Sequence, residues 1–171
     1  MAKIRSGIQL TPQQFNLMWI NAPHRLNLAL WNFEVEVGKS VVSIFKDSFN
    51  KKSWKGKAWA PRSKNTHGTH PLMVETGTLK NSIKWKLIGS GIGQSKGVRI
   101  FTDPTAFGSA ARHKGFCYAA VHNQGLPILA FGKHPMNMPQ RQFMGDDSGE
   151  VNMQIKTLTT KYLHIRHIVH K

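Results

Sequence analysis

The sequence predicts an α+β fold in which a long N-terminal helix and a C-terminal helix pack on a small antiparallel β-sheet. Apolar residues recur at steps of three and four over residues 26–45 and again over 151–165, as on one face of a helix. Apolar and basic residues alternate over 83–87, as in a half-buried strand. With 171 residues, 40% of them hydrophobic, the chain can bury one core. We therefore expect a single domain over residues 1–171.

The N-terminal third is expected to be helical in two pieces. Residues 1–21 should form an arm with a short helix, which starts at Thr11-Pro12-Gln13-Gln14 through a capping box. Asn21 and Pro23 should interrupt this helix and restart a long one over 22–49, because proline is tolerated only in a first turn. The long helix needs a broad partner, such as a sheet or the terminal helix, for a stripe formed by Leu26, Leu30, Phe33, Val37, Val41, Ile44 and Phe45.

Residues 50–71 are expected to form a long, extended basic loop. Periodicity stops there, and the segment contains "KKSWKGKAWAPRSKNTHGTHP". Loops of this length in compact domains are usually functional or disordered, and the large aromatic Trp54 and Trp59 argue against full disorder. The two tryptophans leave two alternatives open, because they can tuck the loop onto the chain's own core or dock into a partner. The residues predicted to meet a partner are Lys51, Lys52, Trp54, Lys55, Lys57, Trp59 and Arg62.

Residues 72–145 are expected to hold the sheet. Thr78 can cap a short helical turn over residues 79–83. The runs "IKWKL" and "VRIFT" are predicted to pair as a hairpin with a basic outer face of Lys84, Lys86 and Arg99. Periodicity does not decide whether "FCYAAVHNQG" is a strand or a helix, and we place a further strand there.

A rigid hinge is predicted just before the last helix, within "MPQRQFMGDDSGEVNMQI". Pro139 restricts the backbone at its start, Phe143 can anchor the turn in the core, and Gly145 can release the chain. Arg141 completes this group. The same composition also suits a plain linker before a helix. Over 146–171 we expect a C-terminal helix and tail, with acidic residues first and basic residues last, as the helix dipole favours.

The charge is strongly positive and uneven. The chain has 24 Lys and Arg against 8 Asp and Glu, a formal net charge of +16. Thirteen basic residues lie between Lys51 and Lys114, against only two acidic ones, Glu75 and Asp103. Because unpaired charge is costly to bury, this segment must place positive charge on a surface. That surface is either simply solvated or meets DNA or an acidic protein.

No chemical site emerges from the motifs. Nine histidines are present, but they lack the convergent spacing and carboxylate partners of a metal site. "VHNQG" is superficially similar to part of a His-Asn-His nuclease, yet metal-holding carboxylates are scarce. Cys117 stands alone, without an activating context. We therefore assign no catalytic residue, no metal ligand and no cofactor, and we expect no enzyme activity.

Targeting signals are also not visible. No apolar run approaches the roughly 20 residues of a membrane span, and the first 15 residues lack the apolar core of a secretory signal. A single cysteine agrees with a reducing compartment. We expect synthesis in a cytosol and no membrane partner.

Four segments, in this order, resemble the phage virion morphogenesis family, the Mu-like and P2-like tail completion or head–tail joining proteins. They are "WKGKAWAPRSKNT", "PLMVETGTLKNSI", "YAAVHNQG" and "MPQRQFMGDDSGEVNMQIKTLTTKYL", and they span about two-thirds of the chain. Family members often carry a second proline where Gln142 stands and a leucine where Met144 stands, so the shape of the predicted hinge differs from the family pattern.

This resemblance implies a structural protein of the virion neck, assembled in the host cytoplasm as a ring of six or twelve copies. Its partners would be the portal or adaptor on one side and tail terminator or tail tube proteins on the other, with double-stranded DNA passing through. The predicted hinge would hold the terminal helix at a fixed angle toward the next subunit. The basic loop would meet acidic rings, and the basic strand face could lie near DNA without sequence specificity. The alternative is a basic phage DNA-binding protein or small nuclease.

Overall fold

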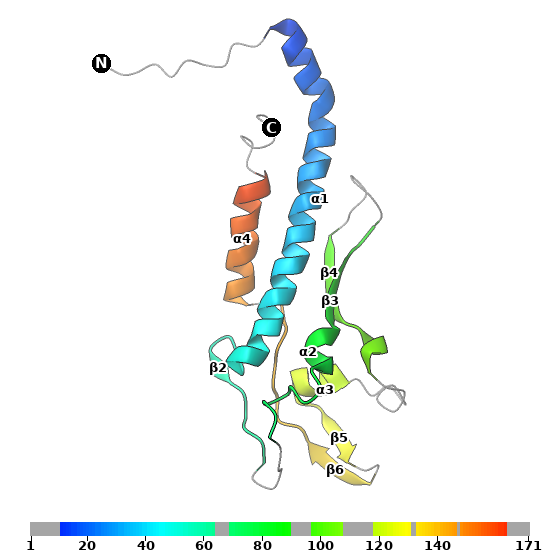
Figure 1. Ribbon diagram of the computed structural model, residues 1–171, viewed down its shortest axis with the longest axis vertical. Helices are drawn as coiled ribbons and strands as arrows, with labels where there is room; N and C mark the ends of the chain where they lie inside the picture. The colour runs from blue at the N-terminus through cyan, green and yellow to red at the C-terminus, as the bar shows by residue number, and fades with distance from the viewer. Residues whose placement is uncertain are drawn as a thin grey trace, which may run out of the picture.

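The long helix α1 (Pro12–Lys51) organises the fold, and the other elements lie beside it or beyond its C-terminal end (Figure 1). The computed structural model describes residues 11–63, 69–89, 97–107, 118–130, 133–146 and 148–163. The expected α+β class is confirmed. The remaining elements are β1 (Ser53–Trp54), β2 (Lys57–Ala58), α2 (Thr78–Ser82), β3 (Ile83–Leu87), β4 (Val98–Thr102), the 3-10 helix η1 (Pro104–Ala106), α3 (Tyr118–Gln124), β5 (Pro127–Ala130), β6 (His134–Asn137) and α4 (Gly149–Leu163).

Helix α1 is continuous, so the predicted break and restart near residue 21 is wrong. The capping box at its start is confirmed: the Gln14 N–H donates to Thr11 Oγ1 at 3.2 Å, and the Thr11 N–H donates to Gln14 Oε1 at 2.9 Å. Asn21 caps nothing, because its side-chain amide donates to the Leu17 carbonyl at 2.9 Å. Pro23 lies inside the helix and removes one backbone donor, but the turns on both sides continue. At the standard rise α1 is about 60 Å long.

An ordered hairpin follows α1, so the extended loop expected over 50–71 is not confirmed. Lys52 ends the helix in the left-handed conformation, with φ of 50°. β1 and β2 are then joined by Lys55 and Gly56, whose φ angles of 50° and 76° are both positive, as a type I′ turn requires. Strands of two residues leave no alternation to detect in a sequence. Residues 64–68 of the expected loop lie outside the described residues.

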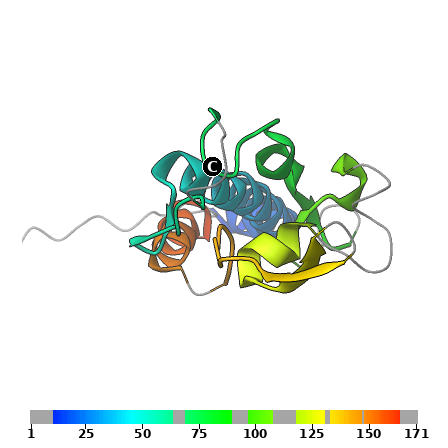
Figure 2. The same ribbon diagram turned by 90° about the horizontal axis from the view of Figure 1, so that it is seen from below.

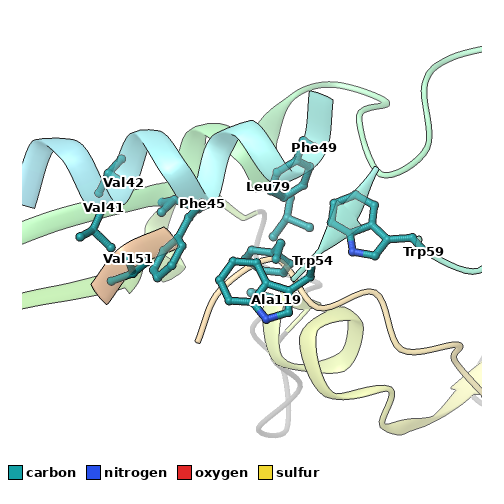
Figure 3. Close-up of a cluster of buried hydrophobic side chains, with 11 residues drawn as sticks. Val41, Val42, Phe45, Phe49, Trp54, Trp59, Leu79, Ala119 and Val151 are labelled. Atoms are coloured by element: carbon teal, nitrogen blue, oxygen red, sulfur yellow. The ribbon is translucent and has the colours of Figure 1, made fainter. Parts of the chain in front are cut away.

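The core lies at the C-terminal half of α1, where aromatic rings from distant segments meet (Figure 3). Phe49 contacts Trp59 and Phe143, with ring centroids 5.4 and 5.2 Å apart, and Phe45 contacts Trp54 at 5.5 Å. Both tryptophans are buried, which decides between the two alternatives in favour of packing on the chain's own core. The other buried residues of this cluster are Val41, Val42, Leu79, Ile83, Ala119 and Val151.

The β3–β4 hairpin forms as the alternating pattern predicts. Its antiparallel register pairs Trp85 with Ile100 and Lys86 with Arg99. Trp85 packs against α1 at Gly38, where a Cβ atom would lie only 2.4 Å from Trp85 Cδ2. This close contact fixes the hairpin along α1 and leaves its basic side chains on the outer face.

The strands form three separate two-stranded sheets within the described residues, not one small sheet. α3 lies where we placed a further strand, and Gly125, with φ of 72°, ends it by donating its N–H to the Val121 carbonyl. The β5–β6 hairpin was not predicted. In α2, Thr78 is the first helical residue and not the cap. The cap position belongs to Gly77, with φ of 74°.

Helix α4 packs along the C-terminal half of α1, as Figures 1 and 2 show. Its apolar stripe is as predicted, since Val151 and Leu158 are buried and Ile155 is half-buried against the core. Gln154 Nε2 lies 3.4 Å from Ser40 Oγ of α1. Residue 165, also placed on this stripe, lies outside the described residues. Among the helices described, none is long and apolar enough to cross a membrane.

Candidate assembly surfaces

Basic residues gather where α1 ends and the β1–β2 hairpin begins. Lys51 is exposed, but its Nζ lies 2.8 Å from an Asp47 oxygen and 3.3 Å from a Glu150 oxygen. The hydrogen bonds to these carboxylates, chiefly that to Asp47, raise the pKa of Lys51. Its charge is therefore balanced within the chain. The other cations of this region, which we call the basic hairpin surface, are the exposed Lys52, Lys55 and Lys57.

Three residues predicted to meet a partner instead serve the chain's own fold. Trp54 and Trp59 lie in the core, with 6% and 7% of their surface exposed. The Arg62 guanidinium donates to the backbone carbonyls of His70 at 2.6 Å and Pro71 at 3.0 Å. It therefore ties together the two sides of the segment after β2. None of the three belongs to the basic hairpin surface.

The outer face of the β3–β4 hairpin carries the three cations predicted there. Lys84 Nζ lies 2.7 Å from Asp103 Oδ2. This bond, with hydrogen bonds from Thr105, holds the pKa of the Asp103 carboxyl far below its ordinary value. Lys86 and Arg99 are exposed and directly opposed in the register. These two residues, which we call the basic strand face, retain a net positive charge.

Arg141 lies in the segment 139–145, where a hinge is predicted, and it is buried at 6% exposure. Its guanidinium donates to the Ala60 carbonyl at 2.9 Å and to the Pro61 carbonyl at 3.0 Å. Its backbone N–H donates to the His122 carbonyl at 2.8 Å. Burial, and then the positive charge of Arg62, lowers the pKa of Arg141. The residue thus joins three parts of the chain far apart in sequence.

Residues 142–145 of this segment are also held in place, whereas Pro139 and Gln140 are exposed. Phe143 is fully buried, in the position expected of an anchor. The side-chain carbonyl of Asn123 accepts the N–H groups of Phe143 at 2.9 Å and Met144 at 3.2 Å. A Cβ atom at Gly145 would lie 3.5 Å from the Trp54 ring. The segment therefore holds α4 in a set position relative to the core.

His122, on α3, is the most perturbed histidine of the described residues. Its ring lies edge-on to Tyr118, with centroids 4.6 Å apart, and its Nδ1 has no hydrogen-bond partner within the described structure. Burial, and then the charge of Arg141, lowers the pKa of His122 to about 4. The side chain is thus neutral at physiological pH and is part of the packing around segment 139–145.

The N-terminal half of α1 forms a surface that the sequence analysis does not single out. It projects beyond the rest of the described structure (Figure 1). From here on, the arm means residues 12–33, which is a different segment from the arm expected over residues 1–21. Several large apolar side chains of the arm lie in the open, and their exposed fractions are Leu17 61%, Trp19 71%, Ile20 72%, Leu26 42%, Leu28 38% and Leu30 38%.

This exposure corrects the expectation that the whole stripe of the long helix is covered within the chain. Val41 and Phe45 are buried, but Leu26 and Leu30 are not. The available signal is charge: the arm holds Arg25 and His24 but no other ionisable side chain. Solvated helices normally carry charge on their outer face, so a stretch of 22 residues with so little charge is unusual for a helix surface left in water.

Comparison with protein-family models, curated proteins and solved structures gives no match for this chain. Within the described ranges, histidine, cysteine, aspartate and glutamate side chains form no group of three suited to a metal ion. The features that bear on function are therefore the surfaces of the chain described above.

Proposed function

We propose that this protein is a structural subunit of a tailed phage virion, a tail completion or head–tail joining protein that forms a closed ring at the neck. One observation carries the proposal: among the described side chains of the arm, six large apolar ones are exposed and are not covered by the described core. Large exposed apolar patches mark interaction sites, because leaving them in water is unfavourable. Assembly of copies through their arms would cover this surface.

The fixed conformation of segment 139–145 supports the proposal. Segment 139–145 is held by Arg141, Phe143 and Asn123, so α4 keeps one orientation relative to the core. A ring closes only if each subunit presents its contacts at a constant angle. A segment fixed on several sides meets this need better than a free linker.

The two basic surfaces suggest what the ring meets. The basic hairpin surface lies at the end of α1 opposite the arm (Figure 1). It suits an acidic face on an adjoining ring, such as the portal or adaptor or the tail terminator or tube. The basic strand face, with Lys86 and Arg99, suits loose, sequence-independent contact with passing double-stranded DNA. The ring would be assembled in the host cytoplasm and retained in the virion.

Electron microscopy of phage particles made with and without the chain tests this function. Without it, filled heads and finished tails should accumulate separately, and antibody against the chain should label the neck of complete particles. Joined, infectious particles lacking the chain would overturn the proposal. Cleavage of DNA by the purified chain would instead support the alternative of a basic DNA-binding protein or nuclease.

A further inference from the structure

Three residues of the arm recur eleven positions further along it, although the two segments differ at the other positions. Residues 15–25 read "FNLMWINAPHR" and residues 26–36 read "LNLALWNFEVE". Asn16 matches Asn27, and Leu17 matches Leu28. Eleven residues make about three turns of an α-helix, so matched positions stay on the same side of it. The arm therefore has lengthwise rows of similar side chains.

Its exposed apolar side chains fall into two rows. Leu17 and Leu26 are nine residues apart, about two and a half turns, and so lie on opposite sides of the helix. We call Trp19, Leu26 and Leu30 the front row, since steps of seven and four place them together. The back row, on the other side, consists of Leu17, Ile20 and Leu28.

Asparagines separate the two rows. At about 100° per residue, Asn16 and Asn27 lie between the rows on one side, and Asn21 and Asn32 lie between them on the other. A helix that buries only one side against its own domain needs one apolar row. Two opposite rows indicate a helix with a neighbour on each side.

The front row continues the face of α1 that α4 covers further along. From Leu30, steps of three, four and seven lead through Phe33 and Val37 to Ile44. Ile44 borders a groove together with Met153 and Gln154 of α4. α4 ends about midway along α1 in Figure 1, while the row continues to Trp19, which is 71% exposed. The exposed part of this face of α1 is therefore apolar in the same way as the part on which α4 packs.

The charge of the chain indicates that the helix which packs on this exposed face belongs to another copy of the protein. Copies with a net charge of +16 repel one another over most of their surface. The arm carries Arg25 as its one permanent charge, so copies can approach each other there at little electrostatic cost. At the standard rise, its 22 residues offer about 33 Å of helix for such a contact.

We propose that the arms of adjacent copies pack side by side and parallel, with the front row of one arm against the back row of the next. This inference rests on the ring of the proposed function and names the surfaces that close it. Because the two rows differ, the contact is heterologous: each arm uses its front row toward one neighbour and its back row toward the other. Such contacts repeat by rotation until a ring closes. The asparagine rows then face the inside and outside of a wall of helices.

Paired cysteines test this geometry. In a Cys117→Ser background, Leu26→Cys lies on the front row and Leu28→Cys on the back row, about 3 Å apart along the axis. In parallel arms at equal height, the thiol of Leu26→Cys in one copy should meet the thiol of Leu28→Cys in its neighbour. Oxidation of the double variant should give a ladder of covalent oligomers. Each single variant should remain uncrosslinked. A dimer from Leu26→Cys alone would show front rows meeting about a twofold axis and overturn the proposal.

Charge placed on a row gives an independent test. Leu26→Glu puts a carboxylate into the proposed contact but is exposed in the single chain, so the circular dichroism spectrum should be unchanged. Its native mass should shift from ring to monomer. The matched control is Asn16→Glu, in an asparagine row, which should keep the ring. Equal behaviour of the two variants would contradict the proposal.

The outcomes separate this inference from the proposed function. A ring in which the cysteine pair fails to cross-link, and which survives Leu26→Glu, overturns the arm contact and leaves the neck ring standing. Dependence of ring size on residues 164–171, with no effect of Leu26→Glu, would show that the chain's own tail covers the front row and would also overturn it. A chain that stays monomeric at all concentrations overturns both.

Discussion

Arg141 shows how a single buried cation can hold distant segments together. Its guanidinium donates to the Ala60 and Pro61 carbonyls, and Arg141 itself is only 6% exposed. We predict that Arg141→Ala lowers the free energy of unfolding by about 2–4 kcal/mol, because two carbonyl oxygens lose a charged donor. Urea denaturation measures this loss. The control is Arg99→Ala on the exposed strand face, which should change stability by under about 0.5 kcal/mol. Similar losses in both variants would contradict this account of Arg141.

His122 gives the fold a pH dependence of known sign. Its pKa is about 4 in the folded chain, below the value of about 6.5 expected when unfolded. Between these values the unfolded state binds the extra proton, so stability falls as the pH is lowered from about 6.5 to about 4, by at most about 1.4 kcal/mol per unit.

The variant His122→Phe keeps an aromatic ring beside Tyr118 and removes this titration. Urea denaturation from pH 7 to pH 4 should therefore show a shallower loss of stability for the variant than for the wild type. The other histidines are common to both proteins and cancel in the comparison. Parallel curves would mean that His122 is not held neutral by burial.

At the residue scale, the sequence predicts apolar anchors better than polar ones. Phe143 could be expected in the core from its type and position. The bonds of Arg141 and Arg62 to backbone carbonyls could not, because arginine is usually exposed and those carbonyls become neighbours only after folding. As a result, the sequence alone does not distinguish basic residues that hold the fold together from basic residues of a binding surface.

At the scale of elements, the contact between α1 and β3 depends on Gly38. Glycine inside a helix usually costs about 1 kcal/mol relative to alanine. Here a Cβ atom would lie 2.4 Å from Trp85 Cδ2, within the ring system and not at a flexible end. We predict that overpacking dominates and that Gly38→Ala lowers the free energy of unfolding by about 1–3 kcal/mol.

Gly149→Ala, at the start of α4, is the matched control. A Cβ atom there meets no atom within 4 Å, so the substitution should be neutral or slightly stabilising. Thermal unfolding of both variants measures the difference. A gain in stability from Gly38→Ala would show that the hairpin shifts freely on α1.

The elements with long periodic patterns were predicted well. The alternation at 83–87 gave the β3–β4 hairpin, and the steps of three and four gave α4 and the C-terminal half of α1. The continuity of α1 through Pro23 was not predictable from local rules, because the cost of one proline is small beside a helix of 40 residues. The two-residue strands β1 and β2 are too short to leave a pattern.

The whole molecule combines a large positive charge with an arm that holds a single permanent charge, Arg25, so salt should affect its two kinds of contact in opposite ways. We predict that self-association strengthens between about 50 and 500 mM NaCl, because salt screens repulsion between copies. Retention of double-stranded DNA should weaken over the same range, because DNA binding releases counterions. Sedimentation and a filter-binding assay measure the two effects. Self-association that weakens with salt would mean that ion pairs, and not the arms, join the copies.

The basic hairpin surface should serve joining and not ring formation. We predict that changing Lys52, Lys55 and Lys57 together to glutamate leaves the native mass unchanged and blocks joining of heads to tails, since an acidic neighbour would then be repelled. The control is Lys156→Glu, an exposed position on α4. A normal yield of virions from the triple variant would refute the role of this surface.

The native mass of the purified chain tests the central claim, that the arm exists to join copies of this protein. We predict one species at micromolar concentration, at a whole multiple of 19.3 kDa that stays constant on dilution, as a closed ring requires. A mass of 19.3 kDa at every concentration, or a series of masses that grows without limit, would contradict the account.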